Sequence, residues 1–133
     1  MDAGNLFAAL SGAMVDPTAA TDGLWFEFPW TGDKFRLARY SSPRAARLRD
    51  ERIAKLPENA TDEDRKRVDE EVFADALLLG WVLAKAPTLE YSRELGLAML
   101  RDPRCYELAT WLRNQTFSDR FRASSPAEVA LGN

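Results

Sequence analysis

The sequence predicts an α+β fold that is mainly α, with an N-terminal aromatic β-hairpin followed by a bundle of about four to five helices. Three observations lead to this prediction. Aromatic and polar residues alternate over 24–30 and again over 34–38, as in half-buried strands. Apolar residues recur at helical spacing from residue 62 onwards, and residues typical of helix starts precede several segments. The length of 133 residues favours one domain.

Residues 1–22 are predicted to form a flexible arm or a short helix. Asn5 could cap a helix over 5–14, although Gly12 would weaken it. Residues 15–23 are expected to form a loop, because they contain Pro17 and Gly23. The single domain is therefore placed at 23–122, and the small, polar segment 123–133 is predicted to be a disordered tail.

The hairpin prediction depends on where the two alternating runs turn. A turn centred on Gly32-Asp33 would pair Trp30 with Phe35 and Phe28 with Leu37, so that the apolar faces of both strands coincide. A two-stranded hairpin is only marginally stable in water. Its aromatic face must therefore be covered by helices or by another chain.

The helical part contains four predicted segments. Ser42 and Pro43 open a thinly apolar surface helix, and Thr61 opens a helix that is expected to run from 62 to about 85. Apolar residues surround this second helix near Leu77–Leu79, so it is the predicted core helix, with Trp81 on its buried stripe. The last two segments begin at Ser92 and Asp102-Pro103, and the final one carries an apolar stripe of Tyr106, Ala109, Leu112 and Thr116.

Residue types that carry chemistry are scarce. The chain has no histidine, which excludes a Ser-His-Asp or Cys-His arrangement built from this chain alone. The only thiol, Cys105, lies on an apolar stripe and is interpreted as a small hydrophobic residue. The carboxylates at 62–64 and 69–71 alternate with bases, which is typical of an exposed helix face. We therefore predict no enzyme, no catalytic residue, no cofactor and no metal.

The net charge of -3 is unevenly distributed. Residues 34–55 are strongly basic, but acidic segments flank them. We therefore expect the basic helix within this range, 43–55, to be solvated or paired within the fold. The helix also lacks an aromatic residue on which bases could stack, which makes nucleic acid an unlikely partner. The start of the chain lacks a basic signal region, and no apolar run approaches membrane-spanning length. These features predict a cytoplasmic protein with no membrane partner.

Three motifs follow one another over residues 23–122. An aromatic hairpin runs into a basic helix ("WFEFPWTGDKFRLARYSSPRAARLR"), and an apolar segment ends in Gly-Trp ("ADALLLGWVLA"). A Tyr-Ser helix start then precedes Asp-Pro and a final helix that ends near a Phe ("LEYSRELGLAMLRDPRCYELATWLRNQTFSDRFR"). In this order the chain resembles the tail assembly chaperone family of long-tailed bacteriophages and prophages. It departs from the family at "AKAPTLE", where many members have a short Asp-Gly-type turn.

The resemblance implies a non-catalytic chaperone that binds the tape measure protein, the tail tube protein or both before the tube polymerises. It also implies a location in the cytoplasm of the bacterial host, absence from the mature virion, and a capacity to form homo-oligomers. The predicted partner-binding or self-association residues are the hairpin aromatics and two arginines of the basic helix: Trp25, Phe26, Phe28, Trp30, Arg44 and Arg47. A hairpin edge would also allow a partner to dock by strand addition.

Two alternative functions remain open at this point. The first is a structural virion component, such as a head–tail connector, an adaptor or a minor tail protein. The second is a nucleic-acid-binding regulator that would use the arginines of the basic helix, Arg44, Arg47, Arg49 and Arg52.

Overall fold

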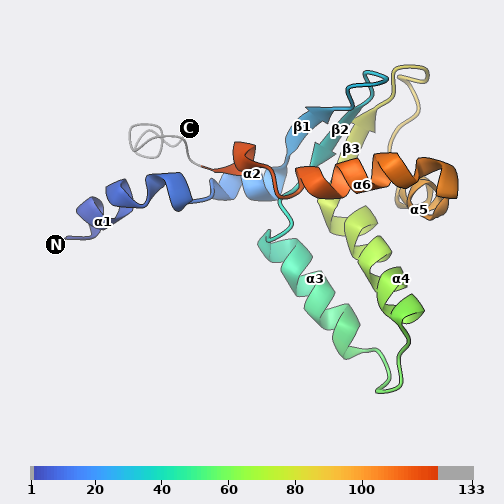
Figure 1. The fold of residues 1–133 in the computed structure, drawn as a ribbon, viewed down its shortest axis with the longest axis horizontal. Coiled ribbons are helices and arrows are strands. Elements are labelled where there is room, and N and C mark those ends of the chain that lie inside the picture. Colours follow the sequence, from blue (N-terminus) through green and yellow to red (C-terminus); the bar gives the residue numbers. More distant parts are fainter. Residues whose placement is uncertain (1, 123–133) are drawn as a thin grey trace.

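A computed structural model of the protein describes residues 2–122, and it confirms the predicted α+β, mainly α fold class. The strands lie beside α5 and α6, while α3 and α4 form a hairpin that projects from the other end of the sheet (Figure 1). In chain order the elements are α1 (Ala3–Ala9), η1 (Ser11–Ala13), α2 (Pro17–Asp22), β1 (Leu24–Glu27), β2 (Lys34–Leu37), α3 (Pro43–Ala54), α4 (Asp62–Val72), η2 (Phe73–Leu77), β3 (Leu78–Val82), α5 (Arg93–Arg101), η3 (Pro103–Cys105), α6 (Tyr106–Gln115) and η4 (Asp119–Phe121).

Strands β1 and β2 form the predicted hairpin, but the predicted register is wrong. Leu37 pairs with Leu24 instead of Phe28, and Phe35 pairs with Phe26 instead of Trp30. A longer loop over 29–32 replaces the two-residue turn. The Gly32 amide donates to the Phe28 carbonyl at 2.9 Å, and the φ of 79° at Gly32 favours glycine. Because the register moves by an even number of residues, each strand keeps its predicted buried face.

The segment Leu78–Val82 is a strand, so the helix predicted over 62–85 is too long. Helix α4 ends at Val72, one π-helical turn follows, and β3 then pairs antiparallel with β2 to complete a sheet of order β1-β2-β3. A continuous apolar run fits a buried strand as well as a buried helix, and periodicity alone does not separate the two. Pairing with β3 satisfies backbone groups of β2 that would otherwise form a free edge.

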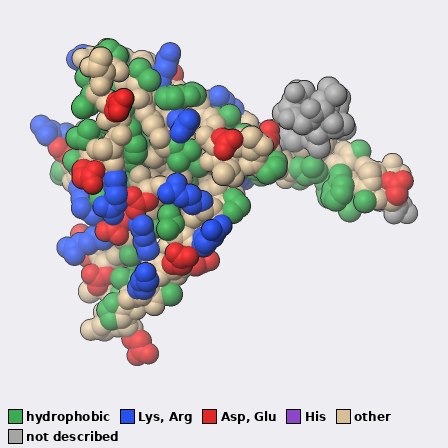
Figure 2. Space-filling view, turned by 180° about the vertical axis from the view of Figure 1, so that it is seen from behind, with side chains coloured by type: hydrophobic (Ala, Val, Ile, Leu, Met, Phe, Trp, Pro, Cys, Tyr) green, Lys and Arg blue, Asp and Glu red, His purple; other side chains and the backbone are tan. Residues whose placement is uncertain are grey.

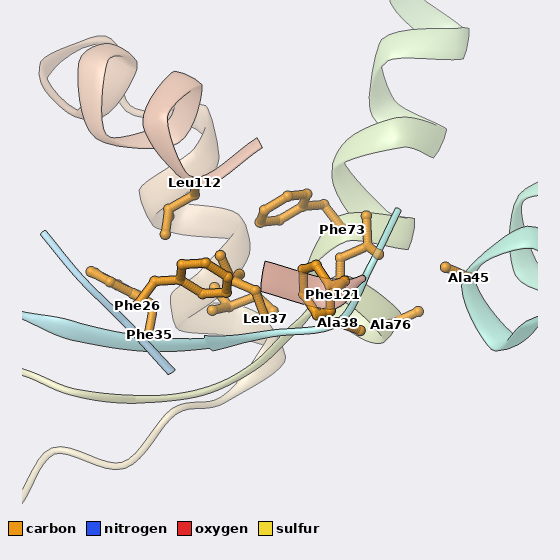
Figure 3. Close-up of a cluster of buried hydrophobic side chains, with 11 residues drawn as sticks. Phe26, Phe35, Leu37, Ala38, Ala45, Phe73, Ala76, Leu112 and Phe121 are labelled. Atoms are coloured by element: carbon orange, nitrogen blue, oxygen red, sulfur yellow. The ribbon is translucent and has the colours of Figure 1, made fainter. Parts of the chain in front are cut away.

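The core lies between one face of the sheet and the helices. Phe26 and Phe35 point from the strands toward Leu112 of α6, and Phe73 reaches the same cluster from the end of α4 (Figure 3). Phe121 of η4 is fully buried, and its ring centroid lies 5.9 Å from that of Phe26. The last described element therefore helps to close the core.

The predicted helix starts are largely confirmed. Thr61 and Asp64 form a reciprocal capping box at the start of α4, and the hydroxyl of Ser92 accepts from the amide of Leu95. The carboxylate of Asp102 accepts from the amide of Arg104 at 2.9 Å. Ser42 precedes α3 as predicted, but its hydroxyl is buried and makes no capping hydrogen bond.

The N-terminal segment is helical, but its details differ from the prediction. Asp2, and not Asn5, caps α1, and α2 occupies most of the predicted loop. Hydrogen bonds to the rest of the fold begin at Ala13, whose carbonyl accepts from the Arg122 guanidinium at 3.3 Å. Val15 then bridges to Arg122, and the amide of Asp16 donates to the carbonyl of Phe121 at 2.9 Å. We refer to residues 2–14 as the arm. The predicted tail at 123–133 lies outside the described residues.

Between residues 2 and 122, none of the helices combines the length and the apolar composition that crossing a bilayer requires.

Candidate functional site

Exposed aromatic side chains gather where the β1–β2 loop meets α6. Trp30 is 76% exposed and Tyr106 is 73% exposed. Phe28 is half-buried, and its ring centroid lies 5.0 Å from that of Trp30 and 5.2 Å from that of Trp111. We call these four residues, Phe28, Trp30, Tyr106 and Trp111, the aromatic surface.

The β1–β2 loop creates this surface. Residues 29–32 form the loop, so Trp30 does not lie on the strand face predicted for it. Phe28 packs edge-to-face on Trp111. The aromatic surface lines a pocket of about 310 Å³, to which Thr110 and Asn114 add polar groups. An apolar side chain of a partner could enter this pocket with polar contacts at its rim.

Trp30 also lines a second, larger groove of about 650 Å³. The walls of this groove are mainly apolar, and Asp33 and Lys85 add one charge of each sign. Its other apolar residues come from β2, β3 and its following loop, α5 and α6: Phe35, Trp81, Leu83, Ala84, Ala86, Met99 and Leu108. The most exposed tryptophan of the described chain thus borders two apolar depressions at once.

Trp81 is held rigidly in the wall of the larger groove. Its indole Nε1 donates to the Leu89 carbonyl at 2.8 Å, and its ring packs edge-to-face on Tyr91 at 4.9 Å and on Phe35 at 6.4 Å. The core position predicted for Trp81 is therefore only partly correct. Its side chain packs against buried residues, but it is half-buried and also faces the groove.

Tyr91 supports Trp81 from behind. Its hydroxyl donates to the Ala74 carbonyl at 2.5 Å, and a Cβ added at Gly96 would lie 2.6 Å from the Tyr91 oxygen. Only glycine leaves room for this ring. Burial of the phenol, with a smaller effect from the negative charge of Asp75, raises the pKa of Tyr91 to about 12.

The predicted hairpin residues do not form one surface. Phe26 is 4% exposed and belongs to the core, whereas Trp25 is 45% exposed and lies on the opposite face of the sheet. Only Phe28 and Trp30 join the aromatic surface. Strand addition at β1 is also hindered, because the guanidinium of Arg120 donates to the carbonyl of Trp25 at 2.8 Å.

The predicted arginines lie far from the aromatic surface. Arg44 and Arg47 are exposed on α3, which projects from the end of the sheet away from the β1–β2 loop (Figure 1). Neither forms an ion pair with any residue of the described chain. The other side of α3 is paired: Arg49 lies 4.0 Å from the Tyr40 ring centroid, and Arg52 lies 2.7 Å from Asp75.

Carboxylates of α4 and of the following π turn connect helices instead of forming a reactive cluster. Glu70 is buried and lies 3.2 Å from Arg101 of α5, and Asp69 pairs with Arg113 of α6. Asp75 lies 2.7 Å from Arg93 as well as from Arg52. Within residues 2–122, no three carboxylate or thiol side chains come together in a way that could hold a metal ion.

Tyr106 is the member of the aromatic surface that the sequence analysis placed on the apolar stripe of the last helix. Its spacing places it on the same stripe as Ala109 and Leu112, which are indeed buried. Tyr106 is exposed because it occupies the first turn of α6, before the helix reaches the sheet. The helical period predicts which residues share one face of a helix, but not how far along the helix other elements cover that face.

Comparison with known proteins gives no relative, since the chain matches no family model, no curated protein and no solved structure.

Proposed function

We propose that the protein is a non-catalytic tail assembly chaperone of a long-tailed phage or prophage. In this role it binds the tape measure protein, the tail tube protein or both in the cytoplasm of the bacterial host. It releases them when the tube polymerises and is absent from the mature virion. The observation that carries the proposal is Trp30, which is 76% exposed between two mainly apolar depressions.

The aromatic surface has the properties expected of a docking site for an apolar helix. Tryptophan and tyrosine dominate the binding energy of many protein interfaces, because they bury a large area at a low entropic cost. A client helix could place neighbouring apolar side chains on either side of Trp30. The client would then be shielded from aggregation until a stronger assembly contact replaces the chaperone.

The motifs that carry the family resemblance meet at this site. Trp81 of the Gly-Trp motif lines the larger groove, and Tyr91 of the Tyr-Ser motif packs against it at 4.9 Å. The hairpin motif contributes Trp30 to the same groove. A shared role in shaping one binding groove would explain why the three motifs occur together in one chain.

Co-expression with the tape measure and tail tube proteins encoded beside this chain tests the proposal. We expect at least one of them to become more soluble and to co-purify with the wild-type protein, and Trp30→Asp to abolish both effects. Ile53→Asp on α3 is the matched control, because it also places a charge on an exposed apolar position, away from the site.

Two results would count against the proposal. If neither client gains solubility nor co-purifies with the wild type, the chaperone function is wrong. If mass spectrometry of purified particles finds this chain at a stoichiometric copy number, a structural virion component is the better description.

A further inference from the structure

The arm carries apolar side chains that the described chain leaves uncovered. No residue of α1 is buried, and Leu6, Phe7 and Leu10 are all exposed, with Phe7 at 53%. At positions i, i+1 and i+4 they lie on one side of the helix. We call the rest of the described chain, residues 15–122, the body. Figure 2 shows the arm standing away from the body with hydrophobic side chains along it. A helix of seven residues is not stable alone in water, so α1 requires a surface to pack on.

The body has a surface of matching character on the outer face of its sheet. The register places Trp25, Arg36 and Gly80 in one row across the strands, and Glu27, Lys34 and Val82 in the next. Trp25 and Val82 are 45% and 44% exposed, and together with neighbouring residues they line a depression of about 410 Å³. The space above Gly80 is open, since no atom lies within 4 Å of a Cβ built there.

An antiparallel sheet that faces water normally presents polar residues on that side. Here Trp25 on β1 and Val82 on β3 are exposed at opposite corners of the two rows, and Gly80 adds no side chain beside Val82. In the view from the side opposite α6, hydrophobic side chains and Lys or Arg side chains intermingle on the body (Figure 2). We call the six residues of the two rows the outer sheet face.

The charges of the two surfaces are complementary. The arm carries one acidic side chain, Asp2, and no basic one. The outer sheet face carries Lys34 and Arg36 against a single acid, Glu27. Neither base forms an ion pair within residues 2–122. Asp2 precedes Leu6 by about one helical turn, so apolar contact and charge pairing can occur together.

We propose that the arm of one copy lies on the outer sheet face of a second copy, with Phe7 and its apolar neighbours against Trp25 and Val82. The root of the arm, where residues 13–15 join the body, holds the arm so that it points away from its own sheet and can reach another molecule. The Arg122 guanidinium donates to the Ala13 carbonyl at 3.3 Å, and the Val15–Arg122 bridge fixes the next step of the chain. From this root the arm extends away from its own sheet (Figure 1). Reciprocal exchange of two arms closes a two-fold dimer.

This inference is independent of the proposed function, because it uses the opposite face of the sheet from the groove that Trp30 and Phe35 line. A dimer formed by arm exchange leaves the aromatic surface of both copies free.

Light scattering coupled to size exclusion tests the dimer. We expect the wild type to show twice the 15.0 kDa mass of one chain, and Phe7→Asp to raise the dimer dissociation constant by about 30-fold or more. Asn5→Asp is the matched control: it adds the same charge on the other side of α1 and should leave the dimer intact. Lys34→Glu combined with Arg36→Glu should also dissociate it.

Cross-linking then tests the placement of the arm. In a Cys105→Ser background, a chain with Phe7→Cys is mixed with a chain with Val82→Cys and oxidised. We expect a disulfide-linked pair, and no such pair when Ile53→Cys replaces Val82→Cys. Three results would overturn the inference: a wild-type mass of one chain, a Phe7→Asp variant that dimerises like the wild type, or a Phe7–Val82 link that forms only when one chain carries both cysteines.

Discussion

The body and the arm contain similar apolar side chains in opposite circumstances. In the body, Phe35 and Leu112 are fully buried and contribute to one continuous core. On the arm, Phe7 and Leu10 are exposed, although they are just as hydrophobic. The difference lies in the supporting elements, because the sheet and several helices surround the first pair, whereas a single short helix carries the second. We therefore expect the buried apolar residues of the body to stabilise the fold, and those of the arm to act between molecules.

The largest expected effect of a substitution is in the core. Phe35→Ala should lower the free energy of unfolding by about 3–5 kcal/mol, because it removes a ring packed against Phe26, Trp81 and α6 and leaves a cavity. Urea denaturation measures the change. Trp25→Ala, on the same sheet but on its outer face, should cost far less, and equal losses for both variants would contradict the distinction between the two faces.

Gly96→Ala should be the next most damaging change. The added methyl group would lie 2.6 Å from the Tyr91 oxygen and 2.9 Å from its Cε1, so the ring or α5 must move, at a cost of about 1–3 kcal/mol. Gly80→Ala is the control, because the space there is open and the stability should change by no more than about 0.5 kcal/mol. Thermal denaturation of both variants tests whether the packing around Tyr91 is as tight as described.

Tyr91 should make the stability of the body depend on alkaline pH. Its pKa rises from the ordinary value of 10.0 to about 12 on folding, so the folded state favours the neutral phenol. The resulting stabilisation is complete below pH 10 and is lost as the pH rises from about 10 to about 12.

Tyr91→Phe lacks both the hydrogen bond and the titration. Below pH 10 it should be less stable than the wild type by about 1 kcal/mol, the usual contribution of such a hydrogen bond. Urea titrations at a series of pH values should show this gap narrowing above pH 10. A gap that stays constant up to pH 12 would mean that the phenol is not protected in the folded state.

The smallest effect on the fold should come from the arm. Phe7→Asp should change the free energy of unfolding by less than about 0.5 kcal/mol when measured at concentrations where the protein is monomeric, because the side chain contributes nothing to the core. A large loss in the monomer would show that the arm packs on its own body, which would remove the contrast between the two regions.

Sequence reasoning succeeded where local rules decide the structure. Thr61, Ser92 and Asp102 cap helical segments as predicted, since a capping side chain acts within three residues of its own position. The buried faces of β1 and β2 were also predictable, because alternation has a period of two.

The features that sequence reasoning did not predict depend on distant parts of the chain. Strand β3 exists because β2 offers it a partner, and the hairpin register follows the backbone hydrogen bonds of the 29–32 loop. The aromatic surface joins Phe28 and Trp30 to two residues of α6 that are far away in sequence. One sequence contains the side chains of such a surface but not their proximity.

The π turn between α4 and β3 bears on the order of folding. Its Ala74 carbonyl accepts the hydroxyl of Tyr91, a residue 17 positions further along the chain. A nascent chain that ends before Tyr91 therefore lacks the partner that holds the turn. Local helix propensity then favours a continuation of α4 through this segment. We expect β3 to form late, after α5 has docked, so that the larger groove and its Trp81 wall are completed only once most of the protein has been synthesised.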